Sequence, residues 1–225
     1  KTEVFLRESF LPQLQDDFSR LLTDGFSLYI DDADPQTVCF AYPRIFTESA
    51  IVNVVRIEIG ALAAWTPTQK ANVTSYAAQR YPKVFEIPST QILTVAPERT
   101  FWEKVTILHK EAFRSKNNLP LRYSRHYYDL YCMDKSPVKE QAYTNLKLLE
   151  RVVRFKDRFY PAGSAHYELA KSGTMRLVPP EVCLGVLKED YEHMKNMIFG
   201  AQPEFDDVMD CIKRLEREIN DESTT

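Results

Sequence analysis

Two kinds of hydrophobic pattern occur along this chain, and one of them is typical of strands. Residues 26–30 and 37–43 are short β-type runs with the turn-forming stretch DDADPQ between them, so we expect a β-hairpin. Residues 50–60 are the longest strand candidate, and residues 91–95 are a last short one. Residues 61–89 contain several prolines and are predicted to be irregular.

The other pattern is helical and occupies the N-terminus and the whole C-terminal half. Residues 1–23 predict a helix with a break near Pro12, because proline cannot continue helical hydrogen bonding. A helix is expected to begin at Pro97, which suits a first turn. Strands segregated from helices indicate the α+β class, with domains at residues 1–96 and 97–225. Further helices are expected over residues 122–133, 138–158, 180–200 and 203–219, with Ser124 as a candidate cap of the first.

Composition narrows the function classes. The 225 residues carry a net charge of −3, so no overall positive charge indicates nucleic-acid binding, although a local basic patch remains open. The six glycines are too scattered for a phosphate-binding loop or a dinucleotide fingerprint. The four cysteines form no CxxC pair, which indicates free, buried thiols in a reducing cytoplasm. No run of 18 apolar residues is present, so we expect no membrane span.

Glu58 lies in the strand-like stretch VVRIEIG, where an apolar context makes a carboxylate unusual. Side chains alternate along a strand, so Arg56 and Glu58 share a face. A surface ion pair between them is the simplest interpretation, and a metal-binding carboxylate is the alternative. The nearby Asp31, Asp32 and Asp34 are interpreted as turn formers at a hairpin tip.

The helix that begins at Pro97 carries two candidate polar residues. Lys104 could bind a phosphate from the flank of the helix, or it could simply be solvated. His109 is interpreted as a packed, hydrogen-bonded histidine and not as a catalyst.

The stretch RYSRHYYDL combines charged and aromatic residues. Arg122, Arg125 and His126 are candidate anion binders, and Asp129 is a candidate acceptor or base. Their spacing of three or four residues places them on one face of a helix. A local Arg125–Asp129 ion pair is the alternative interpretation.

Four basic residues recur along a predicted helix face. Lys147, Arg151, Arg154 and Arg158 follow one another at helical spacing, with Lys156 nearby. They are either a solvated face or a surface that follows a phosphate backbone, which would bind in a strongly salt-dependent way.

The blocks ERTFWEKVTILHKEAFR and RYSRHYYDLYCM, with VVRIEIG upstream and SGTMRLVPP downstream, resemble the AbiEii/AbiGii-type nucleotidyltransferases. These are toxins of bacterial abortive-infection, type IV toxin–antitoxin systems that act in phage defence. The resemblance covers about residues 1–200. It implies part of a DNA polymerase β-like nucleotidyltransferase sheet followed by a helical C-terminal bundle, a cytoplasmic location, and an antitoxin encoded nearby.

The resemblance also assigns roles to residues. It implies metal-assisted attack on the α-phosphate of an NTP, with transfer of the NMP to a tRNA-like RNA or a protein. Glu58 matches a family carboxylate that binds Mg²⁺, and Lys104 matches a lysine that steadies the triphosphate. Arg125, His126, Asp129 and Leu130 match the family block R-D-x-x-D-L, with His126 in place of its first Asp, so Asp129 is the expected catalytic-side carboxylate. The substrate-binding residues expected beside it are Arg122, Arg125, His126, Lys147, Arg151, Arg154 and Arg158.

One family motif has no match in this sequence. The resemblance includes a glycine-containing turn followed by an Asp-x-Asp strand, which supplies two metal-binding carboxylates, and residues 1–57 contain nothing like it. We therefore expect this chain to be the C-terminal part of such a protein, with weak or absent Mg²⁺ binding and no transfer activity alone.

Two other functions compete with this interpretation. A non-catalytic module that binds nucleic acid or an antitoxin would use the basic helix face and would not need Glu58 or Lys104. A helical ribonuclease of the HEPN class uses an Arg and a His with about four to six residues between them. Arg122 and His126 have only three residues between them, and strands precede them.

Overall fold

The computed structural model describes residues 2–22, 24–43, 54–60 and 66–221 of the chain. Its contacts divide the chain into two compact units, residues 1–63 and 64–225. The second unit therefore contains a β-hairpin as well as the helices that the sequence assigns to residues 97–225. The α+β class is confirmed, because small antiparallel sheets precede a helical C-terminal region.

The first unit begins with a helix whose turns change in width. Helix α1 (Thr2–Phe5) continues into the π-helical stretch η1 (Leu6–Phe10) and then α2 (Leu11–Leu21). The Leu11 N–H donates to the carbonyl of Leu6, five residues back. The break expected near Pro12 is confirmed as this wider turn, because proline has no N–H to donate and its ring crowds the preceding turn.

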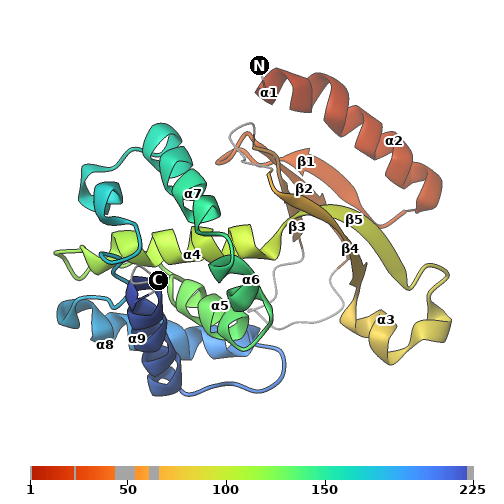
Figure 1. The fold of residues 1–225 in the computed structure, drawn as a ribbon. Coiled ribbons are helices and arrows are strands. Elements are labelled where there is room, and N and C mark those ends of the chain that lie inside the picture. The colour runs from red at the N-terminus through yellow and green to blue at the C-terminus, as the bar shows by residue number, and fades with distance from the viewer. Residues whose placement is uncertain (1, 23, 44–53, 61–65, 222–225) are drawn as a thin grey trace. The chain divides into compact units, whose positions relative to one another are not determined.

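Three antiparallel strands in the order β1–β2–β3 complete the first unit (Figure 1). They are β1 (Ser27–Ile30), β2 (Thr37–Ala41) and β3 (Val54–Glu58), so the hairpin is confirmed, while residues 50–53 of the long strand candidate lie outside the described residues. The core of this unit consists of buried Leu6, Ile30 and Val38, which pack with partly buried residues of α2 and β3. Hydrophobic burial of one sheet face against the N-terminal helix holds the unit together.

The second unit opens with a two-stranded antiparallel sheet that the sequence did not reveal in full. Strand β4 (Thr68–Thr74) pairs with β5 (Ser89–Val95), and α3 (Tyr76–Arg80) and the short η2 (Pro82–Val84) connect them. The expectation that residues 61–89 are irregular is therefore wrong from residue 68 onward, and residues 61–65 lie outside the described residues. Most side chains of TQKANVT are exposed, so no alternation of apolar and polar residues marks this strand.

After β5, the described residues of the second unit form six helices that are each longer than five residues. Helix α4 is central and contacts α5, α6 and α7 (Figure 1). Buried side chains from α4, α5, α7, α8 and α9 form one continuous core. The helices are α4 (Pro97–Ala112), α5 (Ser124–Asp134), α6 (Val138–Tyr143), α7 (Leu146–Phe159), α8 (Glu181–Met194) and α9 (Phe205–Asp221), with the short turns η3 (Gly163–Ala165), η4 (Tyr167–Leu169) and η5 (Lys195–Met197) between them.

Two expectations about these helices are wrong in detail. Residues 138–158 form two helices, because Asn145 leaves the helical conformation with φ −138° and ψ 65°. The hydroxyl of Thr144 donates to the carbonyl of Gln141, a local bond of the kind that competes with helix continuation. Ser124 is also not the cap of α5, because the residue that precedes the helix is Tyr123, whose side chain caps nothing.

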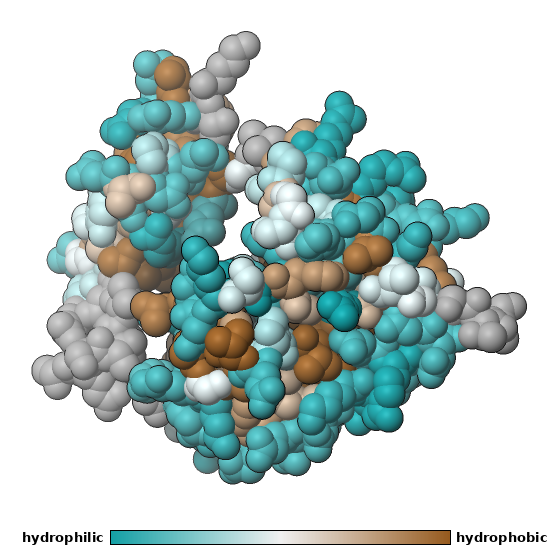
Figure 2. Space-filling model, turned by 90° about the vertical axis from the view of Figure 1, so that its left-hand side faces the viewer, coloured by the Kyte–Doolittle hydropathy of each residue, from teal (hydrophilic) through white to brown (hydrophobic). Residues whose placement is uncertain are grey.

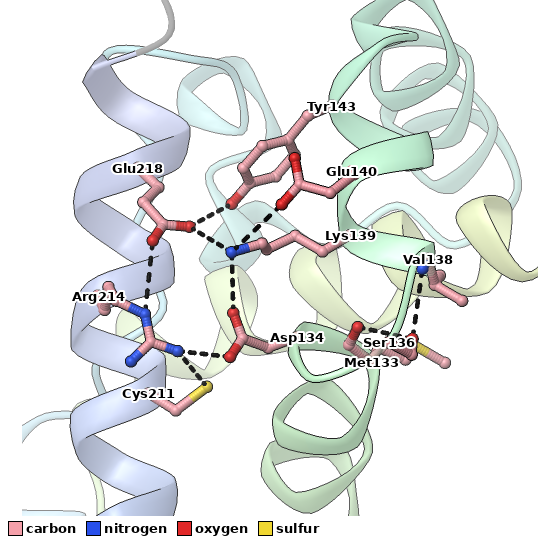
Figure 3. Close-up of polar contacts among 10 residues, drawn as sticks. All are labelled: Met133, Asp134, Ser136, Val138, Lys139, Glu140, Tyr143, Cys211, Arg214 and Glu218. Atoms are coloured by element: carbon pink, nitrogen blue, oxygen red, sulfur yellow. Dashed lines mark hydrogen bonds and ion pairs between the residues drawn. The ribbon is translucent and has the colours of Figure 1, made fainter.

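An ion-pair network built around the buried Asp134 ties α5 and α6 to the C-terminal helix α9 (Figure 3). Lys139 Nζ lies 3.2 Å from Asp134 Oδ1 and 3.3 Å from Glu218 Oε2. Arg214 closes the network by pairing with both of these carboxylates. Because Asp134 is almost fully buried, its charge needs these partners, and the network fixes the end of α5 against α9.

Hydrophilic residues cover most of the face drawn in Figure 2, and hydrophobic residues appear there only in small groups. None of the described helices is both long enough and apolar enough to cross a membrane. All four cysteines are free thiols, but the expectation that all four are buried is wrong, because Cys132 is exposed.

Candidate functional site

Helices α4 and α5 bring together three of the residues that the sequence singled out. Lys104 Nζ lies 2.7 Å from Asp129 Oδ2 and 3.0 Å from His126 Nδ1. We call Lys104, His126 and Asp129 the lysine triad. His126 and Asp129 are three residues apart on α5, so they share the face that meets α4.

The packing of α4 directs Lys104 to this position. The neighbouring Val105 and Leu108 are buried in the core, and Lys104 lies beside them with one fifth of its side chain exposed. A lysine at such an edge buries its methylene groups and keeps its ammonium within reach of water. The triad is thus accessible to a ligand from solvent.

Hydrogen bonding fixes the protonation of His126. An ammonium only donates, so Nδ1 of His126 must accept from Lys104, and the ring proton is then on Nε2. Burial, together with the charges of Lys104 and Arg125, lowers the pKa of His126 to about 4. The imidazole is therefore neutral at physiological pH, and its Nε2–H is a hydrogen-bond donor.

The triad leaves donor capacity for an anion. A lysine ammonium has three N–H groups, and Asp129 and His126 accept two of them. The third N–H can donate to a phosphate oxygen. The exposed Arg125, which directly precedes His126 on α5, adds positive charge. The arrangement can therefore hold an anionic group at the α4–α5 edge.

The alternative Arg125–Asp129 ion pair is not formed, because Asp129 turns to Lys104. Arg122 is also not on the helix face predicted for it. It precedes α5 with a left-handed φ of 62°, and its side chain is exposed. Whether Arg122 and Arg125 bind substrate stays a prediction.

Asp190 of helix α8 anchors the beginning of α5. Its carboxylate accepts from the Arg122 N–H at 2.6 Å and from the Ser124 N–H at 2.8 Å. It also accepts from the Ser124 hydroxyl at 2.5 Å. A carboxylate at a helix N-terminus satisfies N–H groups that have no partner within the helix. Asp190 thereby holds the turn that positions His126.

A pocket of about 260 Å³ lies beside the triad. Its walls come from α4, α7 and η4, and from the residue before α5, Tyr123, whose ring meets that of His126 edge to face with centroids 4.9 Å apart. Lys156 on α7 points into this region and donates to the carbonyl of Glu103 at 2.9 Å. Burial lowers the pKa of Lys156 to about 8, and the nearby cations Lys110 and Lys104 act in the same direction.

The basic side chains of α7 form a separate exposed surface. Lys147, Arg151, Arg154 and Arg158 are all exposed, as their spacing predicts, and we call them the basic stripe. In the described part of the chain none of the four makes an ion pair, so their charges are available to an anionic partner. Their role in substrate binding stays a prediction.

Sequence reasoning did not assign Lys156 a role, although a signal was present. Arg154 and Lys156 are two positions apart, which places them roughly 200° apart around a helix, so Lys156 faces the core and not the stripe. Its neighbours in the pocket wall, Tyr160 and Tyr167, also carried no pattern in the sequence. Segments from different helices meet at this pocket, and only the fold brings them together.

Glu58 lies in the first unit, at the end of β3, opposite Thr37 of β2. Its side chain is exposed, and among the described residues it makes no ion pair or hydrogen bond. The Arg56–Glu58 ion pair, which was the simplest interpretation of this strand, is wrong, because Arg56 binds Asp31 and lies 3.6 Å from Asp34. The catalytic role expected for Glu58 stays a prediction.

Of the three aspartates expected to form the turn at the hairpin tip, Asp31 and Asp34 do so through side-chain hydrogen bonds. Asp31 accepts from the Ala33 N–H at 2.9 Å, and Asp34 accepts from the Thr37 hydroxyl at 2.7 Å. The hydrogen bond from Arg56 is the largest cause that lowers the pKa of Asp31. These carboxylates are therefore occupied by the turn and by Arg56.

The residues present do not by themselves fit a magnesium ion. Within the described ranges, no group of three or more His, Cys, Asp or Glu side chains is placed to hold a metal. Mg²⁺ needs several oxygen ligands, whereas an oxygen of Asp129 is already bound to Lys104. Glu58 as a metal ligand accordingly stays a prediction, and no chemical step is derived through a metal.

Comparison with known proteins gives the family. The sequence model of the family described as "Nucleotidyl transferase AbiEii toxin, Type IV TA system" matches residues 5–211. The chain belongs to this family of nucleotidyltransferase toxins. No curated protein and no solved structure matches the chain.

Family membership agrees with the fold and sets the general class of function. The small antiparallel sheets and the helical C-terminal region are consistent with part of a nucleotidyltransferase fold. A type IV toxin–antitoxin system implies a nucleotide substrate and an antitoxin partner. Nucleotidyltransferases generally use a divalent metal ion.

Proposed function

We propose that this protein transfers an NMP group from an NTP to an RNA acceptor, and that the lysine triad holds the triphosphate. The observation that carries the proposal is the position of Lys104 Nζ, 2.7 Å from Asp129 and 3.0 Å from His126. Two acceptors fix the ammonium, and its remaining N–H is directed to an accessible edge. Such preorganised donors stabilise the negative charge that moves within the triphosphate during transfer.

The neutral His126 supports the same role. At physiological pH its Nε2–H can donate to a phosphate oxygen without adding a second full charge next to Lys104. Arg125 supplies a further cation at the exposed side of α5. Glu58 completes the proposal as a carboxylate for a divalent ion, and the basic stripe as the surface that guides a polyanionic acceptor.

Equilibrium binding of NTPs tests the proposal. The four NTPs are titrated into the chain and into the Lys104→Ala variant, with binding followed by calorimetry. Loss of a charge-assisted hydrogen bond is worth about 1.5–3 kcal/mol, so the variant should bind roughly 10- to 150-fold more weakly. Lys188→Ala is the matched control, because Lys188 is an exposed lysine on α8. Equal NTP affinity of the Lys104→Ala variant and the chain would overturn the proposal.

A non-catalytic RNA-binding module is the second candidate, and the exposed, unpaired basic stripe favours it. The Glu58→Ala, Lys104→Ala double variant separates the two functions. Both predict that the double variant still binds RNA through the stripe. Only the transferase predicts that the double variant loses NTP binding. The module is favoured if the double variant binds NTP as well as the unaltered chain does, or if the unaltered chain binds no NTP at all.

A further inference from the structure

Three tyrosines and two lysines line the pocket of about 260 Å³ beside the lysine triad. Tyr123 comes from the start of α5, Tyr160 from the end of α7, and Tyr167 from η4. The lysines are Lys110 of α4 and Lys156 of α7. Nothing in the family role of the triad accounts for this lining, which combines aromatic rings with positive charge.

The tyrosine rings offer surfaces on which a planar group can stack. Tyr160 lines the pocket, is 52% exposed, and has its ring centroid 6.1 Å from that of Phe155. Tyr167 makes no ring contact with another aromatic residue in the described ranges, while the Tyr123 ring meets only His126. Every nucleobase has a π-face, and proteins that bind single strands stack bases on such rings without reading their sequence.

The lysines supply the complement for a phosphate. Lys156 uses one N–H for the carbonyl of Glu103 and retains two others. Burial lowers the pKa of Lys156 to about 8, so the ammonium is still mostly charged at neutral pH, and a bound anion would favour the charged form further. Lys110 stands on the same wall, six residues after Lys104 on α4.

The location connects the pocket to both functional surfaces. Tyr123 contacts His126 of the lysine triad on one side. Tyr167 also lines a second pocket, of about 330 Å³, whose wall includes Arg154 of the basic stripe. The two pockets share Tyr167 and lie between the stripe and the triad, although Glu150, Asp157 and Glu168 also line the second pocket.

From these observations we propose that the tyrosine pocket is a binding site for one nucleotide, with the base against the tyrosine rings and the phosphate at Lys110 and Lys156. Its volume of about 260 Å³ is below the roughly 300–1,000 Å³ of sites for drug-sized ligands, so it would enclose the base and leave the rest of the nucleotide partly outside. The nucleotide belongs either to the NTP or to the end of a single-stranded RNA acceptor. The restriction of the bound nucleotide to an NTP or an RNA end rests on the proposed function.

The experiment measures the affinity of the full chain for three probes: nucleoside 5′-monophosphates, NTPs and a fluorescent six-nucleotide RNA. Tyr160→Leu and Tyr167→Leu remove a ring each, and loss of a stacked base should weaken binding roughly 5- to 150-fold. The Tyr160→Phe and Tyr167→Phe variants keep the ring and should bind within about twofold of the chain. Tyr81→Leu is the distant control, since Tyr81 is an exposed tyrosine after α3.

The probes distinguish the two sources. If the leucine variants weaken NTP and monophosphate binding but not RNA binding, the pocket takes the NTP. If they weaken RNA binding and leave NTP affinity unchanged, it takes the end of the acceptor. Unchanged affinity for all three probes in both leucine variants would overturn the proposal.

Two further variants keep the test decisive. Tyr167 packs partly against the core, so if Tyr167→Leu lowers the melting temperature strongly, Tyr160→Leu and Lys110→Met decide in its place. Lys104→Ala separates this proposal from the proposed function. If the tyrosine variants bind more weakly while Lys104→Ala binds NTP normally, the nucleotide site in the pocket is supported and the triphosphate role of Lys104 is overturned. If Lys104→Ala loses NTP binding while the tyrosine variants bind normally, the triphosphate role is supported and the pocket proposal is overturned.

Discussion

The ammonium of Lys104 on α4 is held 2.7 Å from the carboxylate of Asp129 on α5. This ion pair both joins the two helices and neutralises the cation that we propose to bind a triphosphate. The two effects oppose each other, because the carboxylate positions Lys104 and at the same time competes with an incoming anion.

We therefore predict that Asp129→Asn binds NTP about two- to fivefold more tightly than the unaltered chain in the presence of EDTA. The amide retains the size of the side chain and an acceptor oxygen, but it removes the negative charge beside Lys104. Calorimetric titration measures the change. Asp206→Asn, an exposed position in the first turn of α9, should have no effect. Weaker binding by Asp129→Asn in EDTA would contradict the competition between carboxylate and triphosphate.

The low pKa of His126 predicts that acid destabilises the fold. The folded pKa of about 4 lies below the ordinary value of 6.5, so between these pH values the unfolded chain binds a proton that the folded chain does not. The neutral His126 makes its full contribution to the free energy of unfolding above pH 6.5. Up to roughly 3 kcal/mol of that free energy is lost as the pH falls to 4.

Urea unfolding at pH 7 and pH 4.5 checks this contribution. The His126→Gln variant should lose less free energy of unfolding between the two pH values than the unaltered chain. His109, whose pKa burial also lowers, is present in both proteins and cancels in the comparison. Exposed His193 provides the control, and His193→Gln should keep the full pH dependence. An identical pH dependence in His126→Gln would refute the prediction.

Asp190 should matter for stability although it lies on α8. Replacement by Ala leaves the N–H groups of Arg122 and Ser124 without their carboxylate acceptor. We expect a loss of about 2–4 kcal/mol in the free energy of unfolding, which denaturant titration can measure. Glu189→Ala, the adjacent exposed residue, should change it by less than about 0.5 kcal/mol. Similar values for both variants would show that Asp190 does not anchor α5.

The basic stripe predicts salt-dependent RNA binding. Each cation that contacts a phosphate of a single strand contributes about 0.7 to the slope of log K against log salt. Arg151→Ala together with Arg154→Ala should therefore reduce that slope by about 1.4. Fluorescence anisotropy at several salt concentrations measures it. The charge-matched control is Lys213→Ala with Arg217→Ala on α9, and an equal reduction there would mean that only net charge matters.

Local patterns were sufficient for the parts of the fold that bury one face. The helix expected to begin at Pro97 forms as α4, and its apolar stripe, which includes Phe101, Val105 and Leu108, is buried. Strand β4 (Thr68–Thr74) was missed because its side chains are mostly exposed and its structure depends on pairing with β5. The break at Asn145 was missed because apolar spacing continues across it, while the backbone does not.

The site was predictable only where a resemblance supplied it. Lys104 and Asp129 came from the matching blocks; the structure places them in contact, and their roles stay predictions. No local sequence pattern predicts the contact between Lys104 and Asp129, because the two residues meet only when α4 packs on α5. The left-handed backbone of Arg122 likewise depends on Asp190, which lies far along the chain.

A crystal structure of the chain with a non-hydrolysable NTP analogue tests the central claim most directly. We predict a phosphate oxygen of the analogue within hydrogen-bond distance of Lys104 Nζ, roughly 2.7–3.2 Å, with His126 and Asp129 still flanking the ammonium. An analogue bound elsewhere, with the Lys104 ammonium contacting only Asp129 and His126, would contradict the account.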